Sequence, residues 1–162
     1  RFRNKPNQNW RKAFWTFQSQ LYTFIDINKQ RGFAAIEETI GNNFENLCLV
    51  TDCWPAYFKT NAEKHQLCLA HLQRELQFFA QKYPKQTWAM RFNLLLYNAY
   101  KLYQKHSSIP KELRDRILNE HLSLLNTKPI QAGNDLLAFY RRMIKYKDHL
   151  FNFLFDLCLT VL

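Results

Sequence analysis

The hydrophobic period of the chain changes near residue 70, and this change constrains the fold more than any other feature. Before it, apolar residues form short β-branched and aromatic runs, whereas after it they recur every three or four residues. The first pattern predicts strands with short helices, and the second predicts amphipathic helices packed on one another. We therefore expect an α/β part in residues 1–71 and a helical part in residues 72–162.

The first part begins with a predicted hairpin. Its strands should be residues 14–19 and 21–27, with a turn near Gln20, because both runs are rich in β-branched and aromatic side chains. A short helix is expected over residues 34–40, and Gly41 followed by two asparagines should end it.

A compact apolar run at residues 47–50 follows and ends in Thr51 and Asp52. Such a run is typical of a strand buried on both faces, in a parallel or central position. Another helix with Pro55 in its first turn is expected next, and residues 66–69 read as a further short strand. Strands alternating with helices in this order indicate an α/β fold.

Asp52 is a candidate functional acid, because open α/β sheets place their crevices at the carboxyl ends of strands. A carboxylate held there can bind a divalent metal through its hard oxygens. The same position also suits an N-cap for a helix beginning near Trp54. Taken alone, the feature favours the capping role and leaves the metal-binding role open.

Cys68 and His71 form a Cys-x-x-His pair that could share a zinc ion. A structural zinc site needs four ligands, and only Cys48 and Cys53 could complete it, at a spacing that fits no standard finger. A buried thiol and a histidine at a helix start are therefore favoured over zinc. Without an export signal, we expect the cysteines to be reduced.

The helical part carries most of the positive charge. The chain has a net charge of +10, and residues 82–162 hold thirteen basic and six acidic side chains. Such a surface fits contact with DNA phosphates, although a solvated helix face is an equally good interpretation for any one residue. The candidates for DNA contact are Arg74, Lys82, Arg141, Arg142 and Lys145, of which the last three should form one patch.

Apolar stripes at helical spacing predict three or four helices here, and the last stripe runs from Leu136 to Leu154. Three glycines are too few for a Gly-rich phosphate loop, which excludes P-loop and dinucleotide-binding proteins. No apolar run is long enough to cross a bilayer, so we expect no membrane-spanning segment.

Two stretches carry a specific resemblance, residues 49–58 (LVTDCWPAYF) and residues 65–76 (HQLCLAHLQREL). They resemble transposases of the insertion-sequence sixty-six family, which carry a strand ending in Asp and then a Cys-x-x-His before an Arg-containing helix. Residues 14–18, 30–34 and 150–154 are similar to further segments of the family, in the same order. The resemblance covers most of the chain.

The resemblance implies a ribonuclease-H-like mixed sheet, here incomplete, with a helical insertion between the second and third acids of an Asp-Asp-Glu triad. Asp52 matches the second Asp. No residue of the chain matches the first Asp or the final Glu of the triad. Asp26 and Asp156 are possible substitutes, but neither fits the family pattern. We therefore expect a piece of a longer catalytic domain.

The implied activity is metal-dependent DNA cleavage and strand transfer during transposition. It needs Mg²⁺ or Mn²⁺, DNA ends and a target as partners, and a homo-oligomer, and it implies a location in the bacterial cytoplasm. One carboxylate cannot organise two metal ions, so we expect this polypeptide alone to be inactive. The alternative is a non-catalytic remnant that binds DNA or another transposase.

Overall fold

A computed structural model describes residues 13–18, 23–30, 32–41, 44–45 and 47–155 of the chain. Strands β1 (Ala13–Gln18) and β2 (Thr23–Asn28) pair antiparallel as the predicted hairpin, with Ala13 opposite Asn28. The expected turn near Gln20 lies outside the described residues.

Helix α1 (Phe33–Ile40) follows the hairpin as predicted. It ends at Gly41, whose N–H donates to the Glu37 carbonyl at 3.0 Å. Gly41 has a φ of 74°, which L-residues with a side chain rarely adopt, so the glycine ends the helix for the reason that the sequence indicated.

Strands β3 (Cys48–Thr51) and β4 (Lys64–Leu67) form a parallel pair, with Cys48 in register with Lys64. The parallel strand expected at residues 47–50 is therefore confirmed. Its residues are half-buried, however, so the prediction of burial on both faces was wrong. The reason is that β4 is its only neighbouring strand among the described residues.

Two further elements of this region differ from expectation. Instead of a helix after Pro55, the chain makes a turn and a short 3₁₀ helix, η1 (Tyr57–Lys59). The strand expected at residues 66–69 begins and ends two residues earlier, because Leu69 already starts the next helix.

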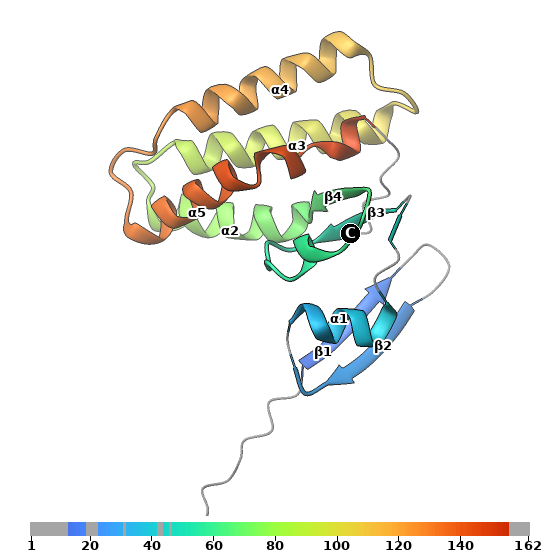
Figure 1. Cartoon of the computed structure of the whole chain (residues 1–162). Helices are drawn as coiled ribbons and strands as arrows, with labels where there is room; N and C mark the ends of the chain where they lie inside the picture. Colours follow the sequence, from blue (N-terminus) through green and yellow to red (C-terminus); the bar gives the residue numbers. More distant parts are fainter. Residues whose placement is uncertain (1–12, 19–22, 31, 42–43, 46, 156–162) are drawn as a thin grey trace, which may run out of the picture.

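The α/β class is confirmed, but the described strands form two separate two-stranded sheets rather than one mixed sheet. In Figure 1 the hairpin and α1 lie together, apart from β3, β4 and the helices above them. The hairpin keeps part of its apolar surface in solvent, since Ile25 is 64% exposed. A ribonuclease-H-like sheet therefore stays a prediction.

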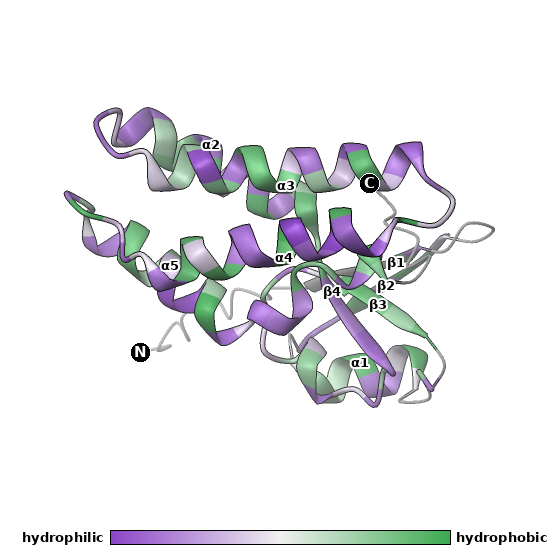
Figure 2. Cartoon of the chain, turned by 90° about the horizontal axis from the view of Figure 1, so that it is seen from above, coloured by the Kyte–Doolittle hydropathy of each residue, from purple (hydrophilic) through white to green (hydrophobic). Residues whose placement is uncertain are grey.

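In the described residues of the second part, the α-helices are α2 (Leu69–Lys82), α3 (Trp88–Lys105), α4 (Lys111–Asn126) and α5 (Asn134–Lys145). They lie side by side over the β3–β4 pair (Figure 1), and each ribbon alternates between hydrophobic and hydrophilic residues (Figure 2). This arrangement confirms the helical period of the sequence. None of the helices in the described part has both the length and the hydrophobicity that crossing a bilayer requires.

The stripe predicted to run to Leu154 is interrupted after α5. The chain continues as two 3₁₀ helices, η2 (Lys147–His149) and η3 (Asn152–Leu154), which pack across β4. The buried Gln66 side chain donates from Nε2 to the Leu150 carbonyl at 3.0 Å and accepts from the Phe153 N–H at 3.2 Å. These backbone groups bind a strand side chain, so they do not extend the helix.

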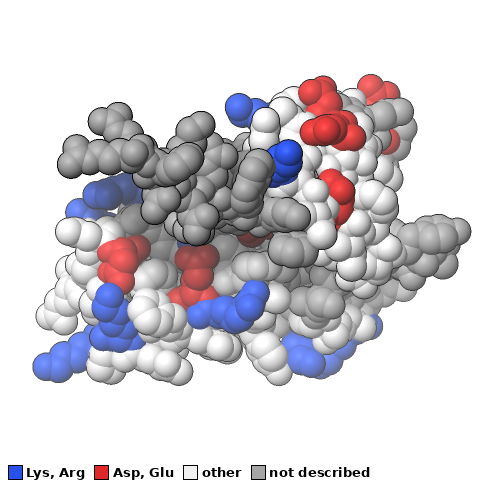
Figure 3. All heavy atoms as spheres, turned by 90° about the horizontal axis from the view of Figure 1, so that it is seen from below, with Lys and Arg blue, Asp and Glu red and all other residues white. Residues whose placement is uncertain are grey.

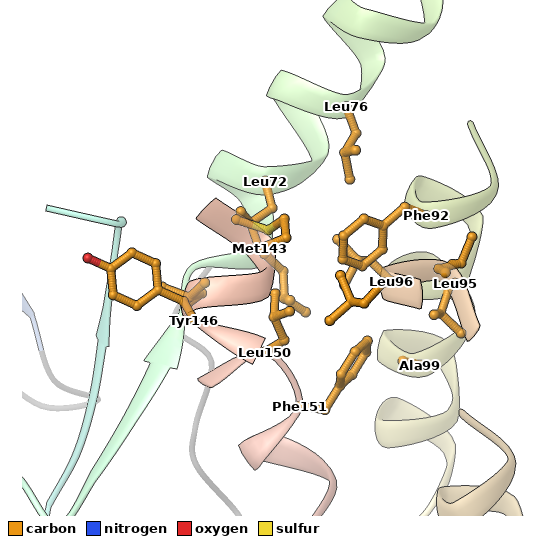
Figure 4. Close-up of a cluster of buried hydrophobic side chains, with 14 of the residues drawn as sticks. Leu72, Leu76, Phe92, Leu95, Leu96, Ala99, Met143, Tyr146, Leu150 and Phe151 are labelled. Atoms are coloured by element: carbon orange, nitrogen blue, oxygen red, sulfur yellow. The ribbon is translucent and has the colours of Figure 1, made fainter. Parts of the chain in front are cut away.

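The main core lies between the helices and β4 (Figure 4). Leu76, Phe92 and Leu96 are completely buried there, with Met143 from α5 beside them. A second, smaller cluster joins α1 to the segment after β3, through Ile36 and others. Because β4 and Cys53 belong to the main core, the helical part packs directly on the segment that contains Asp52.

Candidate functional site

Asp52 lies immediately after the last residue of β3 and is half-buried. Its Oδ1 accepts a hydrogen bond from the Trp54 N–H at 2.8 Å, which is an Asx turn. The prediction of an N-cap was wrong, because no α-helix begins near Trp54, and Asp52 bonds one N–H of a turn instead. The second carboxylate oxygen accepts no hydrogen bond from the described residues and is free for another partner.

Asp52 lines a pocket of about 220 Å³ between the ends of β3 and β4, the first turns of α2, and α5. The pocket brings together five candidates named from the sequence: Asp52, Cys53, Cys68, His71 and Arg142. The other described residues that line it are Thr51, Trp54, Leu67, Leu72 and Glu75. Residues 90 positions apart in the sequence therefore face one small volume.

Glu75 is the pocket residue that the sequence reasoning missed. Its Oε2 accepts a hydrogen bond from Arg142 Nη2, an ion pair that links α2 to α5. Glu75 lies one helical turn after His71, and this i,i+4 spacing was the available signal. The spacing places Glu75 on the same face as His71, but only the fold places Arg142 opposite.

Cys53 and Cys68 are free thiols, as expected, and both line the pocket. Cys48 is disulfide-bonded, so the prediction of a reduced thiol was wrong there. The prediction rested on the lack of an export signal, and this feature does not indicate which cysteines the fold brings close enough to form a disulfide.

Burial raises the pKa of Cys53 to about 11, against a smaller lowering by the charge of Arg142. The carboxylates of Glu75 and Asp52 raise it further. The thiol is therefore protonated at neutral pH, whereas a zinc ligand must be a thiolate. In the described part of the chain, no three His, Cys, Asp or Glu side chains are grouped to bind one metal.

The pocket can also be compared with what Mg²⁺ or Mn²⁺ needs from its ligands. Asp52 offers one free hard oxygen, which suits either ion. Glu75 is the second carboxylate of the pocket, and Arg142 already engages it. The described residues thus fit one ligand of a metal site and do not by themselves form a two-metal centre.

The other basic candidates lie away from the pocket. Lys82 donates to Asp135 at 2.6 Å, and the hydrogen bonds from Lys82 and Tyr83 lower the pKa of Asp135 to about 2. Arg74 is exposed and donates from Nε to the Ala70 carbonyl of its own helix at 3.3 Å.

Arg141 and Lys145 are exposed on α5 and make no ion pair with any described residue. Arg142 turns inward instead, so the expected three-residue patch reduces to these two. On the face drawn in Figure 3, basic side chains lie mainly along the lower edge and acidic ones gather at the upper right, and neither sign covers that surface.

The chain matches a known protein family over almost its whole length. The family model described as "Transposase IS66 family" matches residues 2–161, which include the segments around Asp52 and His71. No curated protein matches, and no solved structure matches.

Proposed function

Because the chain belongs to the IS66 family of transposases, we propose that it supplies part of the catalytic site for metal-dependent DNA strand cleavage and transfer. The observation that carries the proposal is Asp52, which lines a pocket at the end of a parallel strand and has one carboxylate oxygen that accepts no hydrogen bond from the described residues. Strand ends of this kind hold functional acids rigidly.

The family suggests the use of divalent metal in general, and Asp52 is the residue that would hold it here. Bound Mg²⁺ or Mn²⁺ activates the attacking hydroxyl and stabilises the leaving oxygen in such reactions. The Trp54 N–H fixes the orientation of the Asp52 carboxylate through the bond to Oδ1. Asp26 is no substitute, because it accepts from Thr39 at 2.7 Å and does not line the pocket.

We further propose that this polypeptide alone does not cleave DNA, since one free carboxylate cannot position two ions. The ribonuclease-H-like sheet, the helical insertion of residues 72–162 and a homo-oligomer at paired DNA ends belong to the same proposal. The exposed cations Arg74, Arg141 and Lys145 support contact with the DNA backbone. Lys82 is less suited, because Asp135 neutralises it.

Mn²⁺ tests the metal-binding role of Asp52, because this paramagnetic ion broadens the NMR signals of nearby amides even when it binds weakly. We expect selective loss of the signals of residues 51–54 in the wild-type chain and none of this loss in Asp52→Asn. Asp148→Asn is the matched control, since Asp148 is an exposed acid outside the pocket.

The result that would refute the proposal is equal broadening of residues 51–54 in wild type and Asp52→Asn. Salt-dependent DNA binding together with that result would favour the non-catalytic remnant instead.

A further inference from the structure

We infer that Arg142 binds one backbone phosphate of DNA in the Asp52 pocket, and that Glu75 positions its guanidinium for that contact. The inference rests on the proposed function and adds to it a residue from α5, far in sequence from the catalytic strand. Arg142 thereby differs in role from the exposed cations, which would contact DNA at the protein surface and not in the pocket.

Arg142 is held in place on two sides. Glu75 of α2 accepts from its Nη2, and the guanidinium lies over the Phe139 ring, 4.9 Å from the ring centroid. A guanidinium fixed in this way loses little conformational entropy when it binds a ligand. Both partners of the ion pair remain more than one-third exposed, at 34% and 42% of their side chains, so the pair is open to an incoming group.

An unused donor points to the ligand. Arg142 Nε is buried and has no hydrogen-bond partner among the described residues. Leaving a donor unpaired costs free energy, and a small shift of the Arg142 side chain, which is 34% exposed, would let a phosphate oxygen reach it. Phosphate is the natural partner, because its oxygens match the planar fork of a guanidinium and bind it with two parallel hydrogen bonds.

Arg142 supplies the positive charge that a phosphate in this pocket would need. Asp52 and Glu75 are both acidic, and among the described residues that line the pocket Arg142 is the one with a permanent positive charge. A phosphate next to Asp52 would be repelled by both carboxylates without this cation. The volume of about 220 Å³ is enough for a single phosphodiester group and too small for a duplex.

Four variants test the inference through the salt dependence of binding to a short DNA duplex, followed by fluorescence anisotropy. Arg142→Ala should weaken binding about three- to tenfold and reduce the slope of log K against log salt by about 1, the value for one lost phosphate contact. Arg142→Lys keeps the charge and should retain most of the slope. Arg116→Ala is the matched control, because Arg116 is an exposed arginine of α4 outside the pocket, and it should leave the slope unchanged.

Glu75→Gln separates phosphate binding from a structural role. Both Arg142→Ala and Glu75→Gln break the same ion pair, so a purely structural pair predicts equal losses of affinity. If Arg142 binds phosphate, the amide oxygen introduced by Glu75→Gln still accepts from Nη2 and keeps the guanidinium in place, while the competing negative charge is lost. The Glu75→Gln variant should then bind DNA at least as tightly as the wild type. Equal weakening in the two variants, or an Arg142→Ala slope equal to that of Arg116→Ala, would overturn the inference while DNA binding itself persists.

A measurement on the unaltered chain covers the case in which Arg142→Ala fails to fold. Cys53 lines the same pocket, so a phosphate seated at Arg142 should shield it and slow its alkylation by iodoacetamide at about pH 9 at least twofold. Peptide mass spectrometry reads the rate at Cys53 with and without saturating DNA. An unchanged rate would overturn the inference, whereas absence of any DNA binding by the wild type would overturn the proposed function as well.

Discussion

Replacing Gln66 by Leu should destabilise the folded chain by about 2–4 kcal/mol. Gln66 is completely buried, and its side chain bonds the backbone of the segment after α5. Leu has nearly the same size and fits the apolar surroundings, so the substitution removes the hydrogen bonds with little change in packing. The variant therefore isolates the polar contribution of this contact.

The magnitude follows from the two backbone groups of the segment after α5, and the third bond of Gln66, from Nε2 to the adjacent Leu67 carbonyl at 2.8 Å, is left out of the sum. The Leu150 carbonyl accepts from Gln66 Nε2 at 3.0 Å, and the Phe153 N–H donates to Gln66 Oε1 at 3.2 Å. Each group would be left buried without its partner, at a cost of about 1–3 kcal/mol. The gain from burying a more apolar side chain offsets part of this sum, which gives the stated range.

Urea denaturation followed by circular dichroism measures the effect. The midpoint should fall while the m-value stays constant, because the surface exposed on unfolding does not change. Native-state hydrogen exchange gives a local readout, since the Phe153 amide should lose protection by more than amides in α3.

Gln77→Leu is the matched control, because Gln77 is an exposed residue of α2. It should change stability by less than about 0.5 kcal/mol. The reasoning fails if Gln66→Leu changes stability by no more than this control, or if the protection of the Phe153 amide is the same in both variants.

Three other substitutions or conditions give further tests. His121 is 4% exposed, and burial lowers its pKa to about 4, so between pH 7 and pH 5 the unfolded chain binds a proton that the folded chain does not. The free energy of unfolding should therefore fall by about 2 kcal/mol over this range. Urea titrations should show this fall in the wild type and not in His121→Gln. Gly133→Ala should lower the free energy of unfolding by about 1–2 kcal/mol, because a Cβ there would collide with the Tyr83 hydroxyl and disturb its 2.6 Å hydrogen bond to Asp135. An unchanged midpoint of thermal unfolding would contradict this. Cys53, with its pKa raised to about 11 from 9.0, should react with iodoacetamide at pH 8 roughly 100-fold more slowly in the folded chain than in urea, and equal rates would show that the thiol is not buried.

Local patterns in the sequence were sufficient for most elements. The antiparallel hairpin, α1 with its end at Gly41, and the helices from Leu69 onward each depend on residue spacing and on turn residues within a few positions. The motif around Asp52 also gave the family, which the match over residues 2–161 confirms. These features are predictable because neighbours in sequence decide them.

Elements that depend on distant residues were predicted less well. The stripe from Leu136 to Leu154 has helical spacing, yet the chain leaves the helix after Lys145, and Gln66 of β4 bonds the backbone of the segment that follows. The run at residues 47–50 has the composition of a fully buried strand, yet the strand there is half-buried, because β4 is its only neighbouring strand among the described residues.

The site shows the same division. The sequence by itself placed Asp52 at a strand end and His71 at a helix start, and these are local properties. The tertiary structure decided that Arg142 lies in the Asp52 pocket and pairs with Glu75, and that Arg141 lies outside the pocket. Arg141 and Arg142 are chemically identical and adjacent, but the helix turns successive side chains by about 100°, so the packing of α5 against α2 selects which of the two points inward.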